Sequence, residues 1–105
     1  MLVYYPVLID SELAHEGTVS GYSYQLHSNC RVQGNIDYKY LFFVFDDDPD
    51  VPIFVVSAEK AVFPEGELFF CMFSSRGHHN MGIHSDIVEL QAFFQKALRL
   101  ASMYL

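Results

Sequence analysis

A long alternation of apolar and polar residues, interrupted by Gly34-Asn35, constrains the fold more than any other feature of the sequence. In residues 22–32 most even positions are apolar and the odd positions are polar, and in residues 36–44 the even positions are apolar again. Successive side chains of a strand point to opposite faces, so this pattern is typical of half-buried strands. The sequence therefore predicts an antiparallel hairpin with its turn at Gly34-Asn35.

The same pattern predicts the register of this hairpin. A two-residue loop would pair Gln33 with Ile36 and mix polar with apolar residues on both faces. A three-residue loop keeps the apolar residues of both strands together, and a slip of one residue would exchange the faces. We therefore expect a loop over residues 33–35. The predicted pairs are Val32 with Ile36, Cys30 with Tyr38, Leu26 with Phe42, and Arg31 with Asp37.

Outside the hairpin the strand signals are shorter. Residues 1–9 are apolar, but Pro6 cannot donate to a sheet, so we expect an edge strand or an extended arm there. Residues 10–17 are polar and suggest a turn, with at most one turn of helix. The continuously apolar residues 53–56 and 68–73 predict strands that are covered on both faces.

The last part of the chain predicts an amphipathic helix from about Asp86 to Met103. Asp86 and Glu89 have the spacing of a capping box, and Lys96 and Arg99 suit the negative end of the helix dipole. We expect an α+β fold: one domain over residues 1–105, with an antiparallel meander of about five strands and this helix packed on one face. The residues expected to face the sheet are Leu90, Phe94, Ala97, Leu98 and Ala101.

The predicted sheet is too apolar for one helix to cover. Leu41, Phe43 and Phe45 place apolar side chains on the face opposite the helix, and a helix is only about 10 Å wide, which is about two strands. Large apolar patches are rarely left to water. We therefore predict a homodimer that uses these three residues or the edge that contains Pro6.

The net charge of −7 is unevenly distributed. After residue 84, Asp86 and Glu89 balance Lys96 and Arg99, which leaves eleven acidic against four basic residues in 1–84. This balance argues against binding to nucleic acid or to an anionic membrane and allows a basic protein partner, although solubility alone would also explain it. With two cysteines and no apolar run of 18 residues, we expect a cytoplasmic protein.

Two groups of residues are candidates for binding such a partner. The first is the acidic turn, which we define as Asp46, Asp47, Asp48 and Asp50. The positions that an EF-hand loop starting at Asp46 would need as Gly and Glu are Val51 and Ser57, so a calcium loop of that kind is excluded. The second group is a tyrosine patch that the hairpin register would bring together. Its members are Tyr22, Tyr24, Tyr38 and Tyr40.

Three of the five histidines lie between residues 76 and 86, in a segment expected to be a polar loop with positive φ at Gly77 and Gly82. His79, His84 and Asp86 are weak candidates for metal ligands, because no zinc motif of known spacing is present. A histidine oriented by Asp86 could act as a general base, but no nucleophile is marked. The candidate catalytic residues are His78, His79, His84 and Asp86.

Two functions from different classes follow. The first is a small non-enzymatic interaction module, such as an inhibitor, an immunity-type protein or a regulatory protein, which needs no cofactor and binds a basic protein. The alternative is a small metal-assisted or histidine-based enzyme that uses residues 76–86. The charge distribution and the missing catalytic motif favour the interaction module.

Overall fold

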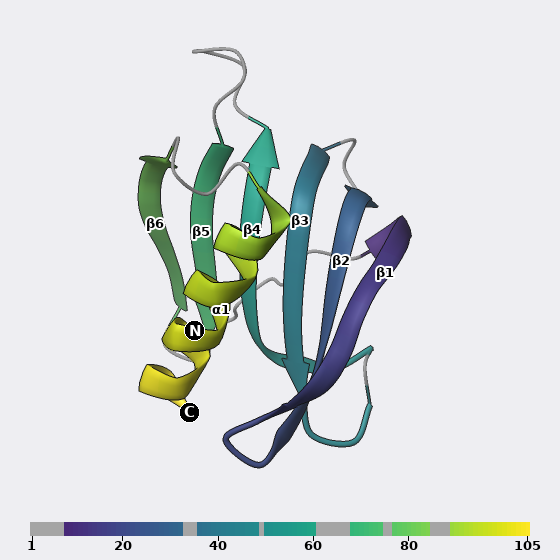
Figure 1. Ribbon diagram of the computed structural model, residues 1–105, viewed down its shortest axis with the longest axis vertical. Coiled ribbons are helices and arrows are strands. Elements are labelled where there is room, and N and C mark those ends of the chain that lie inside the picture. Colours follow the sequence, from purple (N-terminus) through teal and green to yellow (C-terminus); the bar gives the residue numbers. More distant parts are fainter. Residues whose placement is uncertain (1–7, 33–35, 49, 61–67, 75–76, 85–88) are drawn as a thin grey trace.

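The computed structural model describes residues 8–32, 36–48, 50–60, 68–74, 77–84 and 89–105. These residues form one sheet of six strands in chain order, with every neighbouring pair antiparallel, and one helix that packs on the sheet (Figure 1). The predicted α+β meander with a C-terminal helix is confirmed. The elements are β1 (Leu8–Val19), β2 (Tyr22–Val32), β3 (Ile36–Phe45), β4 (Pro52–Lys60), β5 (Leu68–Ser74), β6 (Gly77–His84) and α1 (Leu90–Tyr104).

The central hairpin, β2 with β3, has the predicted register. Val32 pairs with Ile36, Cys30 with Tyr38, and Leu26 with Phe42, and Arg31 is opposite Asp37. The predicted loop over residues 33–35 lies outside the described residues. The strands predicted over 53–56 and 68–73 are also present, as β4 and β5.

The two edges of the sheet differ from the prediction. Residues 10–17 belong to the 12-residue strand β1 rather than to a turn, and the histidine segment forms β6 rather than a loop. Nine of the 12 residues of β1 are exposed, so burial does not impose the apolar periodicity by which a strand is recognised. The turn lies instead at Ser20-Gly21, where both residues have positive φ, as a two-residue hairpin turn requires.

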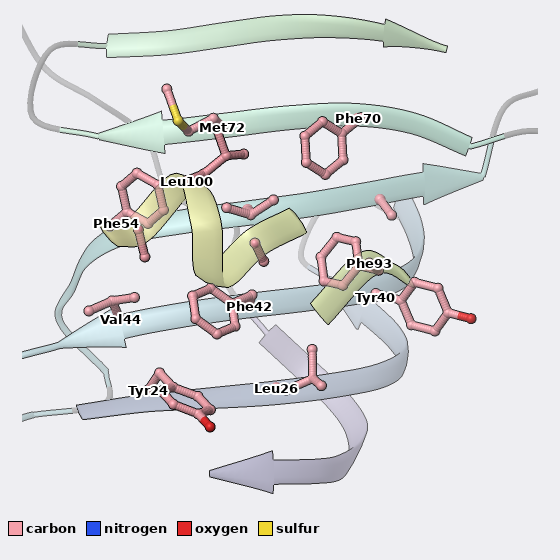
Figure 2. Packing of buried hydrophobic residues seen from close by; sticks show 14 of the residues in the cluster. Tyr24, Leu26, Tyr40, Phe42, Val44, Phe54, Phe70, Met72, Phe93 and Leu100 are labelled. Atoms are coloured by element: carbon pink, nitrogen blue, oxygen red, sulfur yellow. The ribbon is translucent and has the colours of Figure 1, made fainter. Parts of the chain in front are cut away.

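The helix face of the sheet carries the larger core. Aromatic and aliphatic side chains from β2 to β5 converge on Phe93, Ala97, Leu100 and Ala101 of α1 (Figure 2). Phe93 is the centre of this contact, with its ring 5.2 Å from the Tyr40 ring and 6.1 Å from the Phe70 ring, measured between centroids. The sheet also curls towards the helix, because His15 of β1 reaches Phe94 at a ring distance of 5.3 Å.

The helix faces the sheet through a stripe shifted from the predicted one. Phe93 and Leu100 are buried, whereas Leu90, Phe94 and Leu98 are only partly buried at its margins. Ala97 and Ala101 are buried as predicted. Phe93, rather than the predicted Phe94, therefore faces the centre of the sheet.

The helix ends one residue after the predicted Met103, whereas its start at Leu90 is later than predicted. Glu89 itself occupies the N-cap position and makes no side-chain capping bond, while Asp86 lies outside the described residues. The last turn contains no basic residue, since the helix continues to Tyr104. Lys96 instead places its ammonium over the Phe70 ring, 5.4 Å from the centroid. The helix is therefore held by its apolar face rather than by charges at its ends.

The opposite face of the sheet has a second core. Leu41, Phe43 and Val55 are buried there within one chain, and Leu8 packs against this cluster. Phe45 is buried too, at 9% exposed. The structure therefore does not leave Leu41, Phe43 and Phe45 available for the predicted dimer contact, and the edge that contains Pro6 lies outside the described residues. A homodimer stays a prediction.

Two neighbouring β-bulges explain how this second core extends into β2 and β3. Between Ser28 and Arg31, β2 has one residue more than the paired segment of β1, which runs from Glu12 to Asp10. Asn29, within this segment of β2, has φ 50°. Between Tyr38 and Tyr40, β3 likewise has one residue more than β4, where the paired residues Glu59 and Ala58 are adjacent. An extra residue reverses the alternation of side chains between the faces. Tyr40 therefore lies in the helix-face core, whereas Tyr38 lies in the opposite one.

Candidate functional site

The four aspartates of the acidic turn, between β3 and β4, are presented to solvent, and two hydrogen bonds connect residue 48 with residues 50 and 51. Asp46, Asp47, Asp48 and Asp50 are all exposed. The Asp50 backbone N–H donates to Asp48 Oδ1 at 2.9 Å, and the Val51 N–H donates to the Asp48 carbonyl oxygen at 2.9 Å. An aspartate that accepts from the backbone two residues later is a common way of fixing a turn. Asp48 therefore shapes the turn, while the other three carboxylates are free of that role.

A second acidic surface, which the sequence analysis did not find, lies along β1. Asp10, Glu12 and Glu16 are exposed on this edge strand, and none of the residues of β1 is Lys or Arg. Glu12 accepts a hydrogen bond from Asn29 Nδ2 of β2 at 3.1 Å, which fixes its position. The register shift between Leu13 and His15 places Glu16, which pairs with Gln25, on the opposite face of the strand from Glu12, which pairs with Ser28.

The acids of β1 lie at different distances from the acidic turn. Glu16 pairs with Gln25, which pairs with Phe43, whereas Asp10 pairs with Arg31 near the other end of the sheet. Thr18 of β1 pairs with Ser23 of β2, and Ser23 pairs with Phe45, which directly precedes the acidic turn. Two strand spacings separate Thr18 from Phe45, which is about 10 Å. Figure 1 shows the β1–β2 turn and the β3–β4 turn at the same lower end of the molecule. One partner could therefore contact the acidic turn and Glu16.

The predicted tyrosine patch is not a single surface. Tyr22, Tyr24 and Tyr40 belong to the helix-face core, whereas Tyr38 belongs to the opposite core, because the bulges reverse its direction. Tyr24, Tyr38 and Tyr40 are each less than 10% exposed. Burial raises the pKa of all three, in Tyr38 to about 12 with Glu59 and Cys71 adding to the effect. These tyrosines contribute to packing, and their rings are not displayed for a partner.

The structure places the candidate histidines on an edge strand. In the β5–β6 ladder His78 is opposite Phe73, His79 is opposite Met72, and His84 is opposite Leu68. Of these three side chains only that of His79 is described, and it is exposed. Asp86 lies outside the described residues. Gly77 and Gly82 have φ of 118° and 84°, so the predicted positive φ is confirmed, although within a strand.

No group of three or more His, Cys, Asp or Glu residues within the described part of the chain could hold a metal ion. The candidate set His79, His84 and Asp86 is not covered by this statement, since part of it is not described. The enzyme hypothesis therefore stays untested. The metal content of protein purified without a histidine tag tests it.

The two remaining histidines form hydrogen-bonded networks that the sequence did not indicate. His27 is 8% exposed, with Nδ1 2.8 Å from Ser11 Oγ and Nε2 3.1 Å from Gln25 Oε1. The Gln25 oxygen can only accept, so Nε2 carries a proton and, in the neutral ring, Nδ1 accepts from the serine hydroxyl. Burial lowers the pKa of His27, which favours this neutral form.

His15 forms the second network. Its Nδ1 lies 2.9 Å from the Tyr24 hydroxyl, and the two rings are stacked at 5.8 Å. A Cβ atom on Gly17 would lie 2.8 Å from the Tyr24 hydroxyl oxygen, so glycine permits the tyrosine to lie against β1. Both networks connect side chains of β1 with those of β2. They fix the edge strand to the sheet.

The two cysteines are free and buried. Burial raises the pKa of the Cys30 thiol to about 12 and that of Cys71 to about 11. A hydrogen bond to the Leu41 backbone opposes the rise in Cys30, and the Ser57 hydroxyl opposes it in Cys71. At neutral pH both thiols are protonated, and a thiol in this state is a poor nucleophile.

Comparisons of the chain with protein-family models, with curated proteins and with solved structures gave no match. In the part of the chain that the structure describes, no helix has both the length and the apolar character needed to cross a bilayer.

Proposed function

We propose that this protein is a small acidic interaction module that binds a basic surface of another protein through the acidic turn. The observation that carries the proposal is the exposure of four aspartates on one turn whose backbone is held by Asp48. A preformed contact loses little conformational freedom on binding, so more of the interaction energy appears as affinity.

The charge of the turn supports a role in the encounter with the partner. Like charges this close raise each other's energy, and a basic surface relieves that repulsion more fully than dissolved salt does. Complementary charges also speed association by about tenfold to a thousandfold. Of the acids of β1, Glu16 extends the negative field near the turn, since it pairs with Gln25, which pairs with Phe43 two residues before Phe45.

The proposal is tested with two variants that each remove three charges. In the first, Asp46, Asp47 and Asp50 become Asn, and Asp48 is kept because it fixes the turn. In the second, the acids of β1 become amides (D10N/E12Q/E16Q). The probe is the basic protein captured from the native host with the wild-type protein. Association and dissociation rates are measured at low and at moderate salt.

We expect the turn variant to associate at least about tenfold more slowly at low salt, with a smaller change in its dissociation rate, because steering acts mainly on the encounter. The β1 variant has the same net charge and should associate faster than the turn variant. Equal association rates for the wild type and the turn variant would contradict the proposal. A captured partner that proves acidic would contradict it as well.

A further inference from the structure

The edge of the sheet at β1 is open to solvent. Among the described strands β1 pairs with β2 alone, and nine of its 12 residues are exposed. An edge strand presents backbone N–H and C=O groups that a further strand can pair with. Proteins use such edges to bind extended peptide segments, which gain main-chain hydrogen bonds.

The two halves of β1 differ in their suitability for such pairing. All three register shifts between β1 and β2 fall within residues 8–15, and bulges are a common protection against pairing at an edge. From His15 to Val19 the pairing runs without a shift, opposite Leu26 to Tyr22. This regular segment is the part of the edge that can extend a ladder.

The regular segment is also held in place before any partner arrives. The His15 ring contacts Tyr24 and Phe94, and Gly17 lets the Tyr24 ring lie against the strand. His15, Glu16, Gly17 and Thr18 nevertheless remain exposed. A strand that is fixed but accessible pays little ordering entropy when another strand is added.

The charges of β1 define which strand can be added. Its charged residues are Asp10, Glu12 and Glu16, without Lys or Arg, and Glu16 lies in the regular segment. Thr18 is two strand spacings, about 10 Å, from Phe45, which directly precedes the acidic turn. A second copy of the chain would bring two acidic strands together, and like charges on paired strands are destabilising. A segment rich in lysine or arginine would instead be attracted by Glu16 and by the acidic turn.

We infer that β1 binds an extended basic segment of the partner protein, which adds to the sheet as a new strand beside His15–Val19. This inference rests on the proposed function, since it specifies how the basic partner is held. The acidic turn attracts the basic partner, and the edge of β1 retains it through main-chain hydrogen bonds.

The test uses two synthetic peptides of equal charge. The first is a ten-residue peptide of alternating lysine and threonine, and the second has the same sequence with every second backbone nitrogen methylated. Methylation keeps the charge but removes hydrogen-bond donors on one edge of the peptide, so peptides methylated in either phase are used. Binding is followed by the backbone amide chemical shifts of the full chain and by titration of the wild type and of D10N/E12Q/E16Q.

We expect the unmethylated peptide to shift the amides of residues 15–19, and one methylation phase to bind at least about tenfold more weakly, because several hydrogen bonds are lost. The β1 variant should bind about threefold to tenfold more weakly, since exposed charge pairs contribute little each.

Shifts confined to residues 46–51, with equal affinity for all peptides, would overturn strand addition and leave the acidic interaction module intact. Concentration-dependent shifts of β1 without peptide would identify a second copy as the occupant and would also overturn the inference. If no peptide binds, the inference fails. The proposed function is then still decided by the association rates of the native partner.

Discussion

The central strand β3 and the edge strand β1 differ in how much of each strand is buried and in what holds it in place. In β3, residues Leu41 to Val44 are all buried, and their side chains alternate between the cores on the two faces. In β1, nine of the 12 residues are exposed, and the strand is fixed by polar contacts to β2. The centre supplies most of the apolar burial of the fold, while the edge leaves polar and backbone groups accessible to solvent.

The largest effect that separates the two regions should come from Phe93, at the centre of the helix contact. Replacing Phe93 by Ala removes a ring that is fully buried against Tyr40 and Phe70 and should cost about 3–5 kcal/mol of unfolding free energy. The matched control is Phe94→Ala on the next position, which is partly buried and should cost below about 2 kcal/mol. Denaturant titration of both variants measures the difference, and equal losses would show that the helix faces the sheet differently.

A smaller effect is expected at the edge, from Gly17. Replacing Gly17 by Ala places a Cβ atom 2.8 Å from the Tyr24 hydroxyl oxygen, so the tyrosine or the strand must shift. Overpacking of this kind costs about 1–3 kcal/mol. Gly21→Ala is not a clean control because of its positive φ, so Thr18→Ala serves as the matched change on the same exposed strand. A stability of Gly17→Ala equal to that of Thr18→Ala would contradict the close approach of Tyr24 to β1.

The smallest effect should come from the protonation of His27. Because burial lowers its pKa below the ordinary value of 6.5, the unfolded chain binds this proton more readily than the folded chain. The contribution of His27 is therefore complete above about pH 6.5 and is lost as the pH falls through the pKa of the folded state. Comparing the pH dependence of unfolding for the wild type and His27→Gln isolates this contribution, since the other titrating groups are shared. An identical pH dependence would show that His27 is not buried in its neutral form.

The sequence predicted the buried centre of the sheet more accurately than its exposed edge. The pairing of Val32 with Ile36 was predictable, because burial of both strands makes apolar parity visible. The β1 strand was missed because exposure removes that constraint. Tyr38 was assigned to the wrong face because a bulge depends on the neighbouring strands β1 and β4, which a pattern within one hairpin does not contain.

The candidate site was predictable only where its residues are adjacent in the sequence. Four aspartates within five positions indicated the acidic turn. Asp48 accepts a hydrogen bond from the backbone two residues later, which is a common turn contact. The contacts of Ser11 with His27 and of His15 with Tyr24 join residues that are distant along the chain. They depend on the register of β1, which became known only with the structure.

Native-state hydrogen exchange of the backbone amides tests most directly whether the centre of the sheet is stable and its β1 edge is open. We expect the amides of β3 and β4 to exchange only through global unfolding, with a free energy equal to that from denaturant titration. Amides of β1 that point away from β2 should exchange at much lower free energies, because they lie on an open edge. Protection of all β1 amides at the global free energy, in the protein alone and at a concentration where it is monomeric, would contradict the claim that this edge is open to a partner.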